Sequence, residues 1–560
     1  MLGTRDERMA ELQAEYPTWE PMSIWERFAR CAKRYENRVF LAEGERHLTY
    51  GQVFDQVERV SFHLREMGVR AGSGVVVHLR NRAEFVVATF AIARLGAVKV
   101  LANSSSAADE VAMVARMAGA SVLITDAQLS FGDAAPINLA VVVADGRVDG
   151  VPTKAFEALL AACPAPASCA VDADSVCDLM FTSGSTGSPK CVPLTHDQLQ
   201  RSAYSNALNR GFEVGRTLFV LVPFCHCFGY VEALLSALFV GAKLVFSWQR
   251  ISERDFVDAA LREQVNDALA MPYTVAAICD HLERDFVELP CLHALYCAGE
   301  RSSARLYERA RRLLGVCDIV NGYGMTEVCG ATMQSVPGDS AECVSSRVGR
   351  VMPAGSAGLA EFGGALVAYR VVRADGSVAE VGEAGSVEVR GITLTSGYLY
   401  APEANARDFS SDGWFRTGDV GRFDDDGYLE FVGREKESYR INGENVSPTF
   451  VESVIERCPG MERAVVVGVA NPRFGQVGCA FLQFNDSARC DFARVRAWCD
   501  EHLASFQIPK YLVPMAEGDW VRTESGKVLR PLLAEAFERG DFADRCVKQS
   551  FGKGAQAKSA

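Results

Sequence analysis

The chain has 560 residues, of which 49% are hydrophobic and 23% charged, and 58 Lys and Arg against 71 Asp and Glu give a formal net charge of −13. This length predicts roughly two to four domains, and the composition is that of a globular protein rather than a disordered or fibrous one. Because the chain is acidic, it has no general electrostatic attraction to nucleic acid or anionic lipid. A bound polyanion such as a nucleotide must be held by backbone amides and a few placed cations.

Signs of secretion, membrane insertion or a structural metal are lacking in the sequence. Residues 1–16 mix Arg, Asp and Glu and carry no apolar signal-peptide run. The apolar stretches 84–100 and 230–246 are short for a membrane span and contain charges, so buried helix–strand units are expected there. The 18 cysteines are scattered singly, and Cys225-His226-Cys227 has no second Cys/His cluster to complement it. We expect reduced thiols in a cytoplasmic protein and no structural metal site.

The first part of the chain alternates helical and strand patterns. Apolar residues at helical spacing predict a helix over 50–64, and a second helix is expected over 84–95. Short β-branched runs predict strands at 74–79, 97–101 and 121–125. Repeated strand–helix–strand units of this kind predict a largely parallel sheet with helices on both faces.

The next part shows the same alternation of strand and helix patterns, and then the pattern changes to short strands and turns. Further buried strands are expected at 177–182, 218–222, 243–246 and 293–297. Beyond them, short strands at 364–372 and 385–390 flank an Asp375-Gly376 turn and predict a region of hairpins. A final compact stretch shows helices at 448–457 and 491–503 around a strand at 463–469.

These patterns predict an α/β fold with a large N-terminal domain and a small α+β C-terminal domain. The N-terminal domain is expected over 1–435, divided into α/β subdomains at about 1–170 and 171–345 and a β-rich subdomain at 346–434. The C-terminal domain is expected over 436–545, and residues 546–560 are expected to form a disordered tail.

The most informative segment for chemistry is 181–190, which reads FTSGSTGSPK and follows an apolar strand. Its glycines let the backbone approach an anion closely, its hydroxyls and amides donate to phosphate oxygens, and Lys190 adds positive charge. Gly184 and Gly187 are too close together for a Walker A loop. A Ser/Gly surface linker is the alternative reading of this segment taken by itself.

Shorter motifs downstream favour the phosphate-binding interpretation. Residues 321–327 read NGYGMTE, which places an aromatic ring and two glycines ahead of a hydroxyl and a carboxylate. Residues 414–419 read WFRTGD and end in an acid after a turn, Gly433-Arg434 lies at the change of texture, and 525–527 read SGK. Each motif is weak alone, since a lone Thr-Gly-Asp is usually only a turn and most lysines lie on the surface.

In this order, the motifs resemble those of the adenylate-forming superfamily, which comprises acyl-CoA synthetases, non-ribosomal peptide adenylation domains and luciferases. The resemblance covers about 22–533. It implies that a carboxylate is joined to ATP with release of pyrophosphate, and that the acyl-adenylate then passes its acyl group to a thiol. It also implies that the C-terminal domain is mobile and rotates between these steps. ATP and CoA are the implied co-substrates and Mg²⁺ the implied metal.

The resemblance implies a set of nucleotide and catalytic residues. Glu327 and Thr182 match the metal site, Tyr323 would stack on adenine, Asp419 would take the ribose hydroxyls with help from Arg434, and Lys527 would bridge the carboxylate and the α-phosphate. The catalytic set is then Lys527, Thr182, Glu327 and His226. The wider nucleotide and CoA set comprises Thr182, Ser183, Gly184, Ser185, Thr186, Gly187, Lys190, Gly299, Glu300, Asn321, Gly322, Tyr323, Gly324, Thr326, Asp419, Arg434, Gly443 and Glu444.

The hinge and the thiol-facing loop are also implied by the resemblance. Lys436 matches the hinge position, and 440–445 match the loop that faces CoA in relatives. That loop usually begins with two glycines, and Asn442 replaces the first of them, although Asn tolerates left-handed backbone angles well. Phe474 and Gln476 replace the Trp and Glu that are common in relatives, which puts the closure between the domains in question.

The acyl pocket implied by the resemblance has apolar walls. The matching positions are His226, Phe228, Tyr230, Val231, Cys297, Val328, Cys329 and Gly330, with His226 at a gating position. Domains that activate amino acids carry an aspartate near the first of these segments to hold the ammonium group. Here Glu232 is the nearest acid and is expected one helical turn inside. An uncharged acyl chain or ring is therefore expected. The motifs of this sequence look closest to those of carnitine- or crotonobetaine-type, bile-acid and medium-chain CoA ligases.

The sequence thus predicts an ATP-dependent acyl-CoA synthetase acting on an apolar or weakly polar acid. An acyl-AMP ligase that loads a separate carrier protein, and a catalytically inactive binding homologue, are the alternatives. The expected partners are the small-molecule acid, ATP and CoA, with no nucleic acid and no integral membrane association. A monomer or a homodimer is expected.

Overall fold

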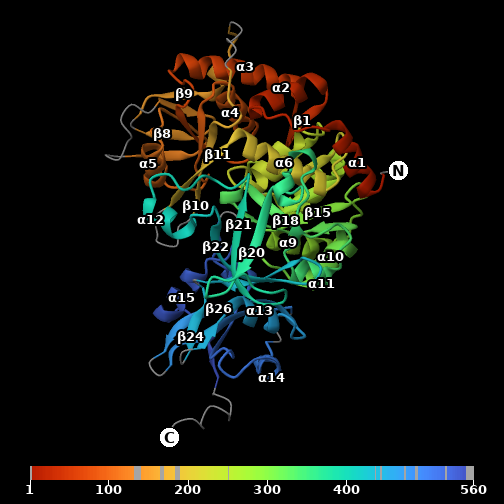
Figure 1. Ribbon diagram of the computed structural model, residues 1–560, viewed down its shortest axis with the longest axis vertical. Helices are drawn as coiled ribbons and strands as arrows, with labels where there is room; N and C mark the ends of the chain where they lie inside the picture. Colours follow the sequence, from red (N-terminus) through yellow and green to blue (C-terminus); the bar gives the residue numbers. More distant parts are fainter. Residues whose placement is uncertain are drawn as a thin grey trace.

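A computed structural model of the chain describes residues 3–131, 140–149, 151–163, 170–182, 189–249, 251–435, 437–441, 444–471, 474–485, 490–523 and 526–549. The large N-terminal part forms the upper body of the molecule and the C-terminal part lies below it (Figure 1). Each part has a hydrophobic core of its own. The expected α/β fold with a large and a small domain is confirmed.

The N-terminal part is built on two seven-stranded sheets. The first has the order β11-β10-β4-β3-β5-β7-β9, with strands Lys190–Thr195, Val176–Thr182, Val98–Leu101, Gly74–His78, Val122–Thr125, Ala140–Val143 and Thr153–Ala155. The second has the order β16-β15-β14-β12-β13-β1-β2, with strands Asp318–Val320, Ala294–Cys297, Asp267–Ala270, Thr217–Val220, Lys243–Phe246, Val39–Glu43 and Arg46–Thr49. Their central strands pair in parallel, as the continuous apolar runs predict.

The two sheets exchange strands across the expected division at about residue 170. β1 comes from the first part of the chain but pairs with β13 in the second sheet, with Leu41 opposite Leu244. β10 comes from the second part but pairs with β4 in the first sheet, with Leu179 opposite Val100. The chain therefore crosses twice between the layers, and the two sheets form one body.

Helices cover these sheets and pack between them (Figure 1). They are α1 Arg5–Glu15, α2 Ile24–Arg34, α3 Tyr50–Glu66, α4 Ala83–Arg94, α5 Ala108–Met117, α6 His196–Asn209, α7 Cys227–Gly229, α8 Glu253–Glu263, α9 Pro272–Arg284, α10 Ala304–Leu314 and α11 Ala341–Ser346. The segment Tyr230–Leu235 after α7 is a π-helix, a form that is frequent at functional sites.

Two small sheets follow, of which the second lies within the expected β-rich region 346–434. A three-stranded sheet holds β17 Gly322–Met325, β18 Gly330–Gln334 and β19 Arg350–Val351, and a four-stranded antiparallel sheet holds β20 Val367–Val372, β21 Gly385–Gly391, β22 Phe415–Phe423 and β23 Leu429–Arg434. The short helix α12, Pro402–Asp408, lies between β21 and β22 in the chain. These sheets carry many of the expected nucleotide residues.

The C-terminal part contains one further sheet with helices packed on it. Its strands are β24 Tyr439–Ile441, β25 Glu444–Val446, β26 Met461–Asn471, β27 Gly475–Phe484, β28 Tyr511–Pro514 and β29 Val547–Lys548, and its helices are α13 Pro448–Ile455, α14 Phe492–His502 and α15 Arg530–Arg539. Leu512 pairs with Val547, so the chain is still part of the sheet where the tail was expected to begin at 546.

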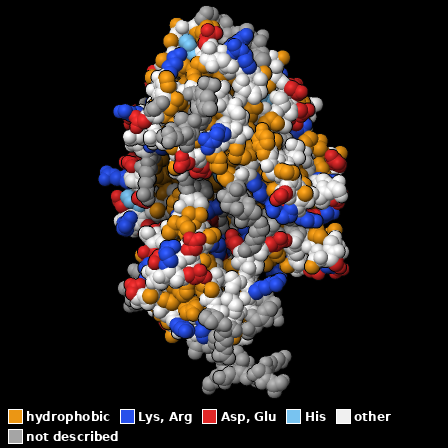
Figure 2. Space-filling view, turned by 90° about the vertical axis from the view of Figure 1, so that its left-hand side faces the viewer, with side chains coloured by type: hydrophobic (Ala, Val, Ile, Leu, Met, Phe, Trp, Pro, Cys, Tyr) orange, Lys and Arg blue, Asp and Glu red, His pale blue; other side chains and the backbone are white. Residues whose placement is uncertain are grey.

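Three further observations concern the described residues alone. Within the described ranges, no helix is long and apolar enough to cross a membrane, and no group of three or more His, Cys, Asp and Glu could hold a metal ion. Every cysteine that the structure describes is a free thiol. On the face shown in Figure 2, Lys and Arg side chains lie interspersed with Asp and Glu. The cytoplasmic location stays a prediction.

Candidate active site

The two ends of the expected phosphate segment lie on neighbouring antiparallel strands. Thr182 ends β10, Lys190 begins β11, and the two residues are paired across the strands. Lys190 Nζ lies 2.7 Å from Asp408 Oδ2 and 4.3 Å from the centroid of the Tyr398 ring. The lysine is therefore held by one acid and one aromatic face, and neither residue was among those expected from the sequence.

Glu327 is oriented by the same tyrosine. It lies in a short 3-10 turn between β17 and β18, and it is 8% exposed. The hydroxyl of Tyr398 donates to Glu327 Oε1 at 2.8 Å, and Thr395 N donates to the carbonyl oxygen of Glu327 at 2.7 Å. Burial raises the pKa of Tyr398, and the adjacent Glu327 raises it further, so Tyr398 stays a hydrogen-bond donor.

Tyr323, Asp419 and Arg434 form a second polar unit on β17, β22 and β23. The Tyr323 hydroxyl donates to Asp419 Oδ2 at 2.7 Å, and Arg434 Nε lies 3.1 Å from Asp419 Oδ1. Asp419 is 1% exposed, and burial raises its pKa, although Arg434 and Tyr323 oppose the shift. Among the described residues, Oδ1 of Asp419 has no hydrogen-bond donor in suitable geometry. A buried acceptor is thus left available beside a cation.

The glycines and the asparagine of the same motif serve the packing of these strands. A Cβ atom on Gly324 would lie 1.9 Å from the carbonyl oxygen of Gly330, so only glycine allows β17 and β18 to approach this closely. The side-chain amide of Asn321 donates to the carbonyl oxygens of Val344 and Arg347 at 2.6 and 3.1 Å. Their expected nucleotide contacts stay predictions.

Lys527 comes from the C-terminal part and reaches this site. Burial lowers its pKa, Arg434 lowers it further, and Glu300 and Asp419 act in the opposite direction. Burial likewise lowers the pKa of His226, and the Lys527 ammonium lowers it further. Both residues nevertheless keep exposed surface. The charge of Lys527 therefore interacts with those of the expected ribose acid and its arginine, and it acts on the pKa of the expected gating histidine.

Glu300, expected among the nucleotide contacts, is engaged elsewhere. Its Oε2 accepts from Arg463 Nη2 at 2.7 Å and its Oε1 accepts from Val528 N at 2.7 Å, and both partners belong to the C-terminal part. Gly299, the preceding residue, has a φ of +96°, and a Cβ there would lie 2.6 Å from the sulfur of Met271. The turn that carries Glu300 toward the other domain thus requires a glycine.

Most residues of the expected acyl pocket lie together in one buried cluster. Phe228, Tyr230, Val231, Val328 and Cys329 belong to the same hydrophobic core, and Gly330 is buried at the start of β18. His226 stands at the start of this wall, where Phe228 N donates to its Nδ1 at 3.2 Å.

Cys297 lies outside this cluster, and its expected place in the pocket wall stays a prediction. Side chains alternate along β15, and Cys297 packs in the core on the opposite face of the sheet, with Tyr307. The neighbouring Tyr296 and Ala298 face the cluster instead, and the rings of Phe228 and Tyr296 meet edge to face at 4.9 Å. Counting strand alternation back from the Gly299 turn is the signal that could have distinguished them.

Charged groups lie buried among these apolar residues. Glu232 is 3% exposed, accepts from Ala331 N at 2.7 Å, and has its pKa raised by burial to about 7. Lys99 Nζ lies 3.5 Å from Asp178 Oδ1 and 3.5 Å from the centroid of the Tyr230 ring. The charges within the apolar runs AVKVL and VCDLM are the sequence signal for this second group, which motif reasoning missed.

Several expected residues lie outside the described part of the chain. They are Ser183, Gly184, Ser185, Thr186 and Gly187 of the phosphate segment, the hinge residue Lys436, and Asn442 and Gly443 of the thiol-facing loop. Glu444 is described only as part of β25. Gln476, one of the departures from the family pattern, has its Oε1 accept from Arg440 N at 3.1 Å within the C-terminal part.

Comparison with known proteins gives matches over nearly the whole chain. The family model of AMP-binding enzymes matches residues 28–399, and the model of the C-terminal domain of AMP-binding enzymes matches residues 451–527. A feruloyl-CoA synthase of Amycolatopsis sp is 31% identical over 508 residues, which are 91% of this chain and 98% of that protein. A 2-succinylbenzoate–CoA ligase of Bacillus licheniformis is 30% identical over 500 residues, covering 89% of this chain and 95% of that one.

A solved structure has the same fold. The o-succinylbenzoate CoA synthetase from Bacillus subtilis, in complex with its acyl-adenylate intermediate OSB-AMP, superposes with a TM-score of 0.75 at 26% identity and covers 91% of this chain and 98% of its own. The family expected from the motifs is therefore confirmed. This chain belongs to the AMP-binding enzymes, the adenylate-forming superfamily.

Proposed function

We propose that this protein is an ATP-dependent acyl-CoA synthetase, which in enzyme class is an AMP-forming carboxylate–CoA ligase. In the first half-reaction a carboxylate oxygen attacks the α-phosphorus of ATP, and pyrophosphate leaves. In the second, the thiolate of CoA attacks the acyl carbonyl, and AMP leaves. The observation that carries the proposal is the position of Lys527 in the C-terminal part: its neighbour Val528 donates to Glu300 of the N-terminal part at 2.7 Å, and its charge interacts with Asp419 and Arg434.

The polar groups of the site suit an ATP molecule. Asp419 Oδ1 is a buried acceptor without a donor among the described residues, and the two ribose hydroxyls would supply donors to it. The Tyr323 hydroxyl donates to Oδ2 of this carboxylate, and the Arg434 guanidinium lies 3.1 Å from Oδ1 as its charge partner. Lys190 and Lys527 supply the cations that a net-negative chain must place locally to receive the phosphates.

Magnesium would be bound as the ATP complex rather than in a site made of protein alone. Mg²⁺ is usually held by one or two carboxylates together with substrate phosphates. Glu327 fits this role, because Tyr398 occupies only its Oε1, and no larger group of possible metal ligands exists in the described part of the chain. When bound, the ion would neutralise charge on the phosphate oxygens. Thr182, at the end of β10, is the expected second residue.

The acid is proposed to be apolar or weakly polar. The wall made of Phe228, Val231, Val328 and Cys329 is buried and uncharged. Glu232 is not free to hold an ammonium group, because it accepts from Ala331 N and, at 3.4 Å, from the side chain of Asn206. Amino acids are therefore disfavoured. The names of the feruloyl and succinylbenzoate relatives support an acid that carries an aromatic ring.

Pyrophosphate release from the full-length protein, with and without CoA, tests this function. The panel is ferulate, 2-succinylbenzoate, benzoate, octanoate and phenylalanine. We expect release with at least one ring-bearing acid and a CoA thioester as product. Release without thioester formation would favour the ligase that loads a carrier protein, and no release with any acid would favour the inactive homologue.

A further inference from the structure

The N-terminal part contacts the chain on both sides of Lys527, at the residue before it and at the residue after it. Thr523 N donates to Lys527 O at 2.7 Å and Lys527 N donates to Thr523 Oγ1 at 3.0 Å, so the backbone of Lys527 is bonded to Thr523. The residue before it, Gly526, and the residue after it, Val528, both contact the N-terminal part. Lys527 is thus placed by its two neighbours in the chain.

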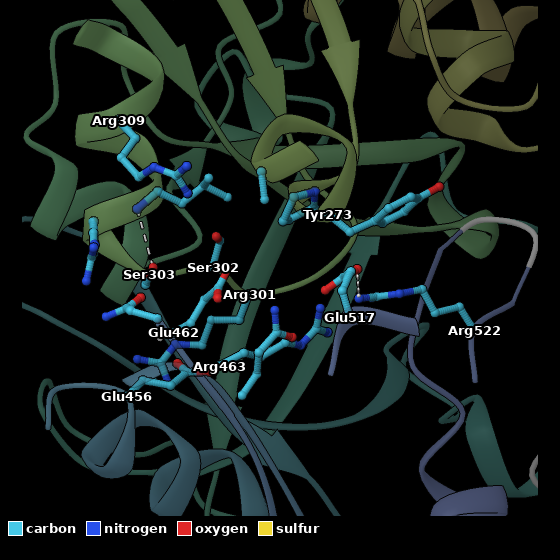
Figure 3. A pocket seen from close by; sticks show the side chains of 16 residues that line it. Tyr273, Arg301, Ser302, Ser303, Arg309, Glu456, Glu462, Arg463, Glu517 and Arg522 are labelled. Atoms are coloured by element: carbon cyan, nitrogen blue, oxygen red, sulfur yellow. Dashed lines mark hydrogen bonds and ion pairs between the residues drawn. The ribbon is translucent and has the colours of Figure 1, made fainter. Parts of the chain in front are cut away.

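On one side, Gly526 packs against the ring of Tyr273 on α9. Gly526 has a φ of +87°, and a Cβ atom there would lie 2.0 Å from Cε1 of Tyr273. The guanidinium of Arg522 lies 4.9 Å from the centroid of the same ring. Figure 3 shows Tyr273 and Arg522 beside each other at the edge of the cavity between the two parts of the molecule. The backbone at position 526 therefore packs so closely on the Tyr273 ring that only a glycine fits there.

On the other side, Glu300 holds Val528 and its surroundings. Its carboxylate is 13% exposed, accepts from Val528 N at 2.7 Å and pairs with Arg463 at 2.7 Å, and Arg522 Nη1 lies 3.9 Å away. Arg463 is itself held with its guanidinium 5.3 Å from the ring centroid of Trp520. The carboxylate of Glu300 thus interacts with one backbone N–H and two guanidinium groups of the C-terminal part.

We propose that Glu300 is a positioning residue, which together with Tyr273 holds Gly526 and Val528, the two chain neighbours of Lys527, and thereby places Lys527 for adenylate formation. This rests on the proposed two-step function. These contacts join residues of the two parts of the chain, so they exist only while the parts are arranged as they are here. Glu300 should then support the first half-reaction and have no role in the second.

The variants Glu300→Ala and Glu300→Gln separate the hydrogen bond from the charge. The alanine removes both, whereas the glutamine keeps an amide oxygen that accepts from Val528 N. We expect Glu300→Ala to lower the turnover of acid-dependent pyrophosphate release on the order of 100-fold, as for other misplaced catalytic groups. The KM for ATP and the rate of CoA thioester formation from supplied acyl-adenylate should stay unchanged. Glu300→Gln should recover most of the loss, and Glu308→Gln, an exposed acid on α10, should behave as the parent protein.

Amide hydrogen exchange of the unliganded protein gives a readout that needs no substrate. Exchange at a peptide containing Val528 should speed up in Glu300→Ala and stay slow in Glu300→Gln. A raised KM for ATP, or an equal loss of both half-reactions, would instead make Glu300 a nucleotide contact and overturn the proposal. Unchanged exchange at Val528 would overturn it as well. If the parent protein activates no acid, the proposed function fails, but the exchange experiment still decides whether the contact between Glu300 and Val528 exists.

Discussion

The hydroxyl of Tyr398 donates a hydrogen bond of 2.8 Å to Oε1 of Glu327, while Lys190 lies 4.3 Å from the centroid of the same tyrosine ring. One aromatic residue therefore touches both the acid expected to bind magnesium and the lysine of the phosphate segment. Asp408 completes the arrangement at 2.7 Å from Lys190.

Replacing Glu327 by Gln tests the assigned metal contact. The variant keeps an oxygen that accepts from Tyr398 but loses the negative charge, so the local hydrogen bond survives while the attraction for Mg²⁺ falls. We expect a higher magnesium concentration at half-maximal pyrophosphate release and a lower maximal rate. Glu361→Gln, an exposed acid in the β-rich region, is the matched control and should titrate as the parent protein does. A magnesium titration identical to the parent's would contradict the assignment.

The sequence predicts where several strands lie but not which strands pair with each other. The runs that become β3 and β13 are predictable because strands buried on both faces read as largely continuous apolar segments. The membership of β1 was not predicted, because its partner β13 lies some two hundred residues further along the chain. Local pattern specifies a strand, and only tertiary packing specifies its neighbour.

In the candidate site, too, local motifs predict some residues, and only tertiary contacts reveal the role of others. Tyr323, Glu327 and Asp419 were assigned from short motifs, and the structure places two of them in direct contact, through the 2.7 Å bond between the Tyr323 hydroxyl and Asp419. Glu300 also lies in an assigned motif, but its partners Arg463 and Val528 come from the other domain. Because those partners are specified only when the domains meet, no motif could reveal its role.

Replacing Tyr323 by Phe removes the donor that orients Asp419. The ring and its packing remain, but a buried carboxylate loses a hydrogen bond, which costs about 1.5 kcal/mol or more for a charged acceptor. We expect the KM for ATP to rise about tenfold, because the ribose acid is no longer held in place. Tyr428→Phe is the control, since its hydroxyl also contacts an aspartate, Asp339 at 3.0 Å, but outside the site. An equal change in both variants would reflect stability alone.

The raised pKa of Glu232 predicts that the free energy of unfolding depends on pH. Burial raises its pKa from 4.5 to about 7, so the folded protein favours the protonated carboxyl. The stabilisation is complete below the unfolded-state pKa and is lost as the pH rises through the folded-state pKa, by up to about 3 kcal/mol. Glu232→Gln has no proton to lose. Urea unfolding at about pH 5 and pH 8 should show the parent protein losing more stability than this variant. Glu157→Gln, an exposed acid, should follow the parent, and parallel curves for Glu232→Gln would refute the shift.

Replacing Lys527 by Ala should separate the two half-reactions. The lysine reaches the site only through the turn that Gly526 and Val528 anchor on the N-terminal part, so it can serve chemistry only in this arrangement of the domains. Loss of its ammonium removes a cation from the site of phosphate charge, and pyrophosphate release should fall by a factor on the order of 100 or more.

Thioester formation from supplied acyl-adenylate should continue at the parent rate, because that step has no phosphate transfer for Lys527 to assist. Lys154→Ala, which changes an exposed lysine on β9, controls for the loss of one positive charge and should leave both steps intact. If Lys527→Ala slows both half-reactions equally, the lysine contributes to binding the adenylate itself. Its effect would then not depend on how the two domains are arranged.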